Sequence, residues 1–376
     1  MKFRFLFLLL MLFLSSCSDF DISTTRAKNA SEEKDILIGA VWPWTGQKGS
    51  LWSGIELALD QANQGGGVLG RKIRIQKDDD EASLAKGRLI AQEYSENKDM
   101  VAVIGHLNSY IALPAAYTYQ SSGLVYLTPG ASDYQINLNN YDLVFRSSLS
   151  NRSIGRHAAE YMYQKKYKNI GIIYLKDKTS RGMANYFEQR VRELGLNLID
   201  RRSYNVGSED FSQITNLWKN LYNFDAIFIA GNMPAAGKLI ESLRAEGINA
   251  PIVGGDGMDT PFLPKLNKVA EGVVLPLLYN LENNSELNLN FVNSYKAKYN
   301  RLPDTFAAQG YDALNLILHA IRISNSAVPE QVAKTLHQVK QFQGVTGSFT
   351  YNELGDMVDR EIRFKMVKNA QYVIVE

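Results

Sequence analysis

Two serines that could bind a carboxylate each follow a short apolar segment. Ser109 comes shortly after the run 101–104, and Ser132 comes shortly after the run 124–127. A hydroxyl and free backbone N–H groups where a strand gives way to a helix form a ready anion site. Both serines could instead cap the helices that follow, and the two roles can coexist. The sequence therefore indicates a carboxylate site, helix caps, or both.

An acidic residue occupies a comparable place later in the chain. Asp256 stands in a Gly-Gly-Asp-Gly sequence at 254–257, directly after the apolar run 251–253. A lone carboxylate buried in a cleft is costly unless a cation meets it, so Asp256 indicates a ligand with a cationic group. The alternative is a turn residue, because Asp and Gly are both common in turns.

Motifs typical of enzymes, cofactor sites and metal sites are absent from the sequence. Gly65-x-Gly67-x-x-Gly70 matches a dinucleotide fingerprint by its letters, but it precedes a predicted strand, whereas the fingerprint must follow one. The chain has no phosphate-binding loop and no Gly-x-Ser-x-Gly nucleophile motif. Its histidines are scattered without metal-ligand spacing: His106, His157, His319 and His337. We therefore expect a binding protein, not an enzyme, with no metal and no cofactor.

The elements that position these residues are short apolar strands alternating with helical patterns. The run 36–41 reads as a buried strand, and Ile55, Ala58 and Ala62 then fall on one face of a helix. The alternation restarts near residue 150 and ends in β-rich sequence. It predicts an α/β fold of two doubly wound parallel-sheet lobes. Ligands of such sheets bind beyond the carboxyl ends of the strands, so facing lobes would share one cleft.

The N-terminus has the layout of a secretory signal that ends at the single cysteine. Lys2 and Arg4 precede an apolar run of about ten residues, too short for a membrane span of roughly twenty. Leu14-Ser15-Ser16-Cys17 resembles the lipobox of bacterial lipoproteins, whose cysteine receives a lipid. We expect a lipoprotein signal peptide at 1–16 and a periplasmic or extracytoplasmic protein anchored to a membrane through Cys17. The alternative is a free cysteine at the end of an ordinary signal.

The polar stretch 17–34 is predicted to be a flexible tether, with an ordered N-terminal arm as the alternative. The remaining chain of about 340 residues is too long for one core, which again favours two lobes. The 41 basic and 39 acidic residues of the full sequence nearly balance, which argues against a nucleic-acid partner. Without a second cysteine, no intramolecular disulfide can form.

The chain resembles the type I periplasmic solute-binding proteins, in particular the leucine/isoleucine/valine-binding branch that serves ABC importers. The resemblance runs through nearly all of 35–376 in ordered blocks. They include Trp44-Thr45-Gly46, Gly54-Ile55-Glu56-Leu57-Ala58, Gly105-His106-Leu107-Asn108-Ser109, Thr128-Pro129-Gly130-Ala131-Ser132, Phe145-Arg146 and Gly255-Asp256-Gly257. The resemblance implies three hinge crossovers. It places lobe 1 at 35–146 and 280–341, and lobe 2 at 147–279 and 342–376.

The same resemblance assigns roles to individual residues. Ser109 and Ser132 match the residues that hold the ligand's α-carboxylate. Ser132 and the carbonyl of Ala131 match acceptors for its α-ammonium, and Asp256 matches the acidic residue that pairs with it. Trp44 lies in a loop that reaches the ligand in relatives, where it could stack on a flat or apolar group. The alternative for Trp44 is that it only covers the edge of the lobe.

Two positions depart from the family pattern. By the resemblance, Arg181 falls where the family has a tyrosine that contacts the ligand's carboxylate, and the next family tyrosine falls at Asn232 or Met233. An arginine can form a bidentate pair with a carboxylate, which suggests an amino-acid-like or amide-like ligand more polar than leucine. The alternative for Arg181 is a solvated helix start.

Together these features predict a monomeric, lipid-anchored receptor that captures a small ligand and docks on an ABC permease. A second hypothesis is a lipoprotein that uses the same fold as an interaction partner, for example of a cell-wall synthase, without transport.

Overall fold

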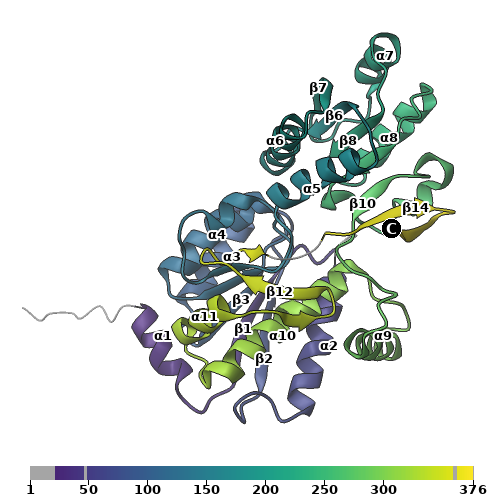
Figure 1. The fold of residues 1–376 in the computed structure, drawn as a ribbon. Helices are drawn as coiled ribbons and strands as arrows, with labels where there is room; N and C mark the ends of the chain where they lie inside the picture. The colour runs from purple at the N-terminus through teal and green to yellow at the C-terminus, as the bar shows by residue number, and fades with distance from the viewer. Residues whose placement is uncertain (1–21, 46–48, 359–361, 376) are drawn as a thin grey trace, which may run out of the picture.

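The computed structural model describes residues 22–45, 49–358 and 362–375. Two α/β lobes follow one another along the chain, with their sheets in separate halves of the molecule (Figure 1). The predicted fold class is confirmed, because parallel strands alternate with helices in both lobes. No helix within the described ranges is long and apolar enough to cross a membrane.

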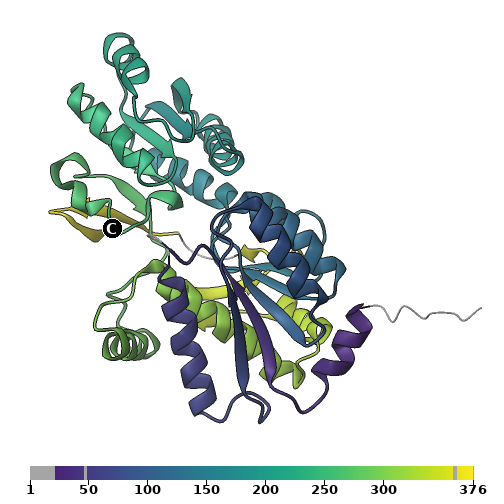
Figure 2. The same ribbon diagram turned by 180° about the vertical axis from the view of Figure 1, so that it is seen from behind.

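Lobe 1 is built on a five-stranded parallel sheet of order β2-β1-β3-β4-β5. Its strands are β1 Ile36–Val41, β2 Ile73–Asp78, β3 Met100–Gly105, β4 Val125–Thr128 and β5 Val144–Arg146. All of β3 and β4 is buried, as expected for apolar strands covered on both faces. Figures 1 and 2 show the helices on either face of this sheet. They are α2 Leu51–Gln64 and α10 Thr305–Ser324 on one side, and α3 Leu84–Glu96 and α4 Ser109–Ser121 on the other.

Lobe 2 contains a seven-stranded sheet of order β15-β14-β10-β9-β8-β6-β7. Its strands are β6 Asn169–Leu175, β7 Asn197–Tyr204, β8 Ala226–Ala230, β9 Ile252–Gly254, β10 Val274–Pro276, β14 Phe364–Lys368 and β15 Gln371–Val375. Phe228 packs into one hydrophobic cluster, while Ile227 and Ile229 pack into another, so both faces of the sheet are buried. The covering helices are α5 Asn151–Gln164, α6 Lys178–Glu193, α7 Ser212–Leu221 and α8 Ala235–Ala245.

The last part of the chain divides differently from the predicted boundary at 342. A small sheet of β11 Phe342–Gly344, β12 Gly347–Tyr351 and β13 Met357–Val358 lies beside lobe 1 (Figure 1). The side chains of Phe342 and Phe349 join the core cluster that contains α10 and α11 Pro329–Gln338. Only β14 and β15 join the sheet of lobe 2, so the segment 342–358 belongs with lobe 1. The sequence predicted β12 within a β-rich end of the chain, but not β11 or β13, and it could not show which lobe buries this sheet.

The predicted tether is also partly wrong, because residues 22–30 form helix α1 (Ile22–Ala30). Arg26 is fully buried, and its guanidinium donates to the carbonyls of Ser95, Asn97, Met100 and Ser122. These bonds fasten the helix to lobe 1, which corresponds to the ordered-arm alternative. The signal segment 1–16 and Cys17 lie outside the described residues.

Candidate ligand-binding site

The sequence-predicted serines of lobe 1 lie at the carboxyl ends of neighbouring strands. Ser109 is the first residue of α4, after β3, and Ser132 follows β4. The backbone N–H of Asp133 donates to Ser109 Oγ at 3.2 Å, so the two loops are in direct contact. Ser109, Ala131 and Ser132 are all buried. The structure therefore brings the predicted lobe 1 residues together at one edge of the sheet.

The hydroxyl of Thr128, at the end of β4, also joins these two loops. Thr128 Oγ1 donates to the carbonyl of His106 at 3.0 Å and accepts from the N–H of Ala131 at 3.0 Å. One hydroxyl thus joins the loop after β3 to the loop after β4. Sequence reasoning missed Thr128, although its place at the end of a strand and beside Pro129 was visible.

His106 is held by a fully buried polar cluster. Its Nδ1 lies 2.7 Å from Asp80 Oδ2, and its Nε2 lies 3.2 Å from the hydroxyl of Tyr119. The backbone N–H of His106 donates to the hydroxyl of Tyr126, and burial raises the pKa of Tyr126, so this phenol stays neutral at neutral pH. Buried polar groups that are all hydrogen-bonded rigidify their surroundings. The cluster therefore gives the loop that carries Ser109 a fixed position.

The three predicted residues of lobe 2 also lie at strand ends, after β6, β8 and β9. Arg181 is exposed in the first turn of α6, and Asn232 is exposed after β8. Asp256 is half-buried and begins the 3-10 turn Asp256–Met258. A Cβ placed on Gly257 would lie 1.9 Å from Asn232 Oδ1, which shows that the loops after β8 and β9 touch. The structure brings the loops of Asn232 and Asp256 together, and it buries all three side chains less than those of lobe 1.

Asn151, the first residue of α5, links the two groups of residues. Its N–H donates to the carbonyl of Ser132 at 2.7 Å, and its side-chain oxygen accepts from the N–H of Tyr134 at 3.0 Å. Its side-chain nitrogen donates to the carbonyl of Thr179 at 3.2 Å, two residues before Arg181. Asn151 was not predicted from the sequence, because a polar residue at a helix start ordinarily indicates a cap.

Trp44, in the loop after β1, contacts residues of β2 and α2. Its indole N–H donates to the carbonyl of Asp78 at 2.7 Å, and its ring meets Trp52 edge-on with centroids 5.7 Å apart. Lys77 Nζ lies 4.9 Å from the Trp44 ring centroid. These contacts hold the ring of Trp44 beside the carboxyl end of β2.

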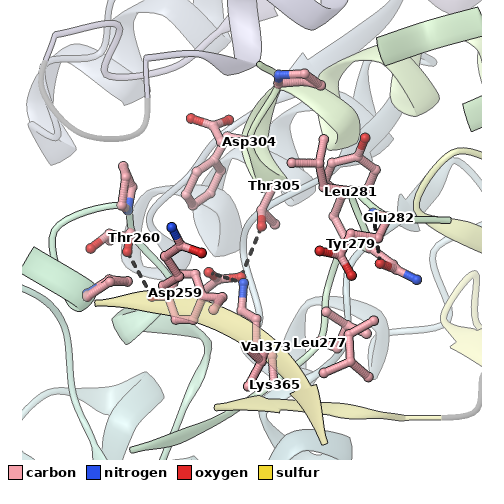
Figure 3. Close-up of a pocket in the computed structure, with 18 of the residues that line it drawn as sticks. Asp259, Thr260, Leu277, Tyr279, Leu281, Glu282, Asp304, Thr305, Lys365 and Val373 are labelled. Carbon is pink, nitrogen blue, oxygen red and sulfur yellow. Dashed lines mark hydrogen bonds and ion pairs between the residues drawn. The ribbon is translucent and has the colours of Figure 1, made fainter. Parts of the chain in front are cut away.

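A cavity of about 420 Å³ lies between the lobes beside the second crossover. Residues of 259–265 and 365–374 from lobe 2, of 303–306 from lobe 1, and of the connection 277–282 line it (Figure 3). At its base Lys365 Nζ lies 2.6 Å from Asp259 Oδ1, with both side chains almost completely buried. Thr305 Oγ1 donates to Asp259 Oδ2 at 3.0 Å, so the ion pair also joins the lobes. Within the described residues, no cluster of histidine, cysteine or acidic side chains could hold a metal ion.

Comparisons with known proteins agree with this architecture. A family model described as periplasmic binding protein matches residues 35–371. An ABC transporter substrate-binding protein from Desulfitobacterium hafniense is 31% identical, with a TM-score of 0.82 over 91% of this chain and 100% of that one. A structure of that name in complex with Leu matches equally well. The Leu/Ile/Val-binding protein of Escherichia coli K12 is 27% identical over 87% of this chain and 89% of its own length. The leucine-binding protein LivK from Thermotoga maritima shares the fold, with a TM-score of 0.83 at 24% identity over 91% of this chain and 98% of that one.

Proposed function

Because the chain belongs to the periplasmic binding protein family, we propose that it captures an amino-acid-like ligand between its lobes and delivers it to an ABC permease. The family is extracytoplasmic and its members bind solutes without chemical conversion, so the chain is a binding protein and not an enzyme. The contact between the two strand-end loops through Ser109 and Asp133 is the observation that best supports an amino-acid-like ligand.

The arrangement suits a ligand with a carboxylate and an ammonium group. Ser109 begins α4, where free N–H groups and the helix dipole favour an anion. On the opposite lobe, the carboxylate of Asp256 offers a partner for a cation, and the guanidinium of Arg181 offers a second partner for a carboxylate. Hinge closure would bring the two sets of side chains onto one ligand. The binding proteins named above also favour ligand capture over the interaction-partner hypothesis.

A thermal-shift and calorimetry screen of the purified chain against amino acids and amides tests this function. A ligand at 100 times its Kd stabilises the folded protein by about 2.7 kcal/mol, which gives a clear rise in Tm. Ser109→Ala should weaken binding, whereas Ser121→Ala, an exposed serine at the other end of α4, should not. If no amino acid or amide raises the Tm of the wild-type chain, the proposal is wrong.

The membrane attachment of this receptor is a separate part of the proposal. Cys17 follows a short apolar run and two small residues, which supports lipid attachment. A tethered receptor stays at high effective concentration near a permease in the same membrane. In producing cells, Cys17→Ala should move the protein from the membrane fraction to the soluble fraction. Unchanged membrane fractionation of this variant would contradict the anchor.

A further inference from the structure

A buried ion pair between Arg146 and Asp356 lies directly behind the candidate ligand site, although neither residue is a predicted contact of the ligand. We propose that this pair positions the loop 131–133, so that ligand affinity depends on a carboxylate of the C-terminal segment that lies outside the site. The inference rests on the proposed function, because it takes Ser132 as a contact of the ligand.

Arg146 is the centre of this arrangement. It is the last residue of β5 and is fully buried. Its Nη1 donates to the carbonyl of Asp133 at 2.7 Å, and its Nε donates to Asp356 Oδ1 at 3.0 Å. Its Nη2 lies 2.8 Å from the same carboxylate oxygen. One guanidinium therefore joins the ligand loop to the C-terminal segment, because its planar group presents several donors in fixed directions.

The backbone of the ligand loop is held on both sides of Asp133. Its N–H donates to Ser109 Oγ at 3.2 Å, and its carbonyl accepts from Arg146. The preceding carbonyl, that of Ser132, accepts from the N–H of Asn151 at 2.7 Å. Because peptide units are planar, these bonds fix the backbone from which the side chain of Ser132 projects. Loss of the bond to Arg146 would release one side of this backbone.

A tight turn between β12 and β13 presents Asp356 to Arg146. Asn352 Oδ1 accepts from the N–H of Asp356 at 3.0 Å, which closes the turn. The N–H of Arg146 donates to the carbonyl of Gly355 at 3.0 Å. A Cβ placed on Gly355 would lie 2.2 Å from the carbonyl oxygen of Val144, and φ of this residue is +70°. Glycine at 355 therefore lets the turn pack directly on β5.

Both partners of the ion pair lie where the chain leaves lobe 1. Arg146 ends the last strand of the lobe 1 sheet before α5, and Asp356 directly precedes β13, after which the chain enters β14 of lobe 2. The pair thus holds the lobe 1 ends of two crossovers together. Because the same guanidinium holds the ligand loop, this loop keeps its position relative to both crossovers.

The burial of the two charges makes the position of the guanidinium depend on Asp356. The side chains of Arg146 and Asp356 are 0% and 8% exposed. Removal of one partner of a buried ion pair leaves the other charge uncompensated. Asp356→Asn keeps the size of the side chain but removes its charge, so the guanidinium loses the partner that orients it toward Asp133. A pair that only stabilised the fold would instead affect all of lobe 1 equally.

Hydrogen–deuterium exchange of the purified chain without ligand separates these two roles. In Asp356→Asn, the N–H groups of Asp133 and Asn151 should exchange at least about tenfold faster than in the wild type, because local opening sets their exchange rate. The amides of β3 and β4 should exchange at the wild-type rate. Arg146→Lys should have the same local effect, because an ammonium lacks the planar fork that joins Asp356 to the Asp133 carbonyl. It decides the outcome if Asp356→Asn does not fold.

Calorimetry with leucine, alanine and glutamine as probes gives the functional result. The affinity for a probe that binds the wild type should fall about threefold to tenfold in Asp356→Asn, as expected for the loss of one positioning hydrogen bond. Thr346→Val is the matched control in the same small sheet. Thr346 is buried between β11 and β12, and its hydroxyl donates to Asp312 Oδ2 at 2.6 Å. This variant should change neither the exchange of the ligand loop nor the affinity.

The inference is overturned if exchange at Asp133 stays at the wild-type rate, or if the loop and the strands β3 and β4 accelerate equally. Faster exchange of the loop with unchanged affinity also overturns it, as does an equal loss of affinity in Thr346→Val. Wild-type protein that binds none of the probe amino acids contradicts the proposed function instead. In that case the exchange rates alone still decide whether the ion pair positions the loop.

Discussion

In lobe 1, Ser109 and Ser132 are buried and tied together by hydrogen bonds, whereas Arg181 and Asn232 of lobe 2 are exposed and Asp256 is half-buried. Both lobes place their residues at the ends of parallel strands, so the fold is not the source of this difference. In lobe 1 the buried Asp80–His106 pair lies directly behind the loop that carries Ser109 and holds it in place.

This difference indicates that the two lobes have different roles when a ligand binds. A preorganised site loses little entropy when its ligand arrives, so lobe 1 is suited to bind first and to set the orientation of the ligand. Exposed side chains such as Arg181 can adjust when the hinge closes. On the proposed function, Arg181 and Asn232 would therefore make adaptable contacts, and the buried loops of lobe 1 would make the fixed ones.

The largest expected difference in stability is between two glycine-to-alanine variants, one beside the candidate residues of each lobe. In Gly130→Ala, the new Cβ would meet the ring of the buried Trp42, which cannot move aside. In Gly255→Ala, it would meet Sδ of Met183 at 2.6 Å, the flexible end of a side chain that can shift. We expect Gly130→Ala to lower the free energy of unfolding by about 1–3 kcal/mol and to weaken ligand binding, and Gly255→Ala to cost less than about 1 kcal/mol. Denaturant unfolding measures the free energy of unfolding of each variant, and calorimetry measures its ligand affinity. Equal losses of stability in the two variants would contradict the difference in rigidity between the lobes.

A smaller effect should follow from removing the hydroxyl that joins the two lobe 1 loops. Thr128→Val leaves the N–H of Ala131 and the carbonyl of His106 without this partner. We expect ligand affinity to fall about threefold to tenfold, because a neutral hydrogen bond contributes about 0.5–1.5 kcal/mol. Thr128→Ser keeps the hydroxyl and should restore the affinity measured by calorimetry. If both variants bind equally well, the hydroxyl does not position the site.

The smallest effect is expected in lobe 2, at Arg181. An exposed ion pair contributes about 0.2–1 kcal/mol, so Arg181→Ala should weaken binding by about fivefold or less. The loss should shrink as salt is added, because salt screens exposed charges. Calorimetry at low and high ionic strength measures this dependence. An affinity that is unchanged at every salt concentration would instead identify Arg181 as a solvated helix start.

The position of the candidate residues at strand ends could be predicted, because strand ends are local features of the sequence. Apolar runs followed by Ser109, Ser132 or Asp256 specify strands that end in polar residues, and parallel strands bring such ends to one edge. Arg181 and Asn232 were instead proposed through the family resemblance, and the structure places them in the loops after β6 and β8. The sequence could not show that the ring of Trp44 contacts Asp78, Trp52 and Lys77.

The sequence by itself determined the two-lobed α/β fold and the residues at the strand ends, because periodicity and loop composition act over short stretches of chain. Only the tertiary structure decided that α1 is anchored by Arg26, that 342–358 joins lobe 1, and that Asn151 bridges the lobes. Only the tertiary structure also decided the cavity between the lobes, since its walls come from segments more than a hundred residues apart. Contacts between distant segments depend on which surfaces remain to be buried once the sheets have formed, and no local pattern records that outcome.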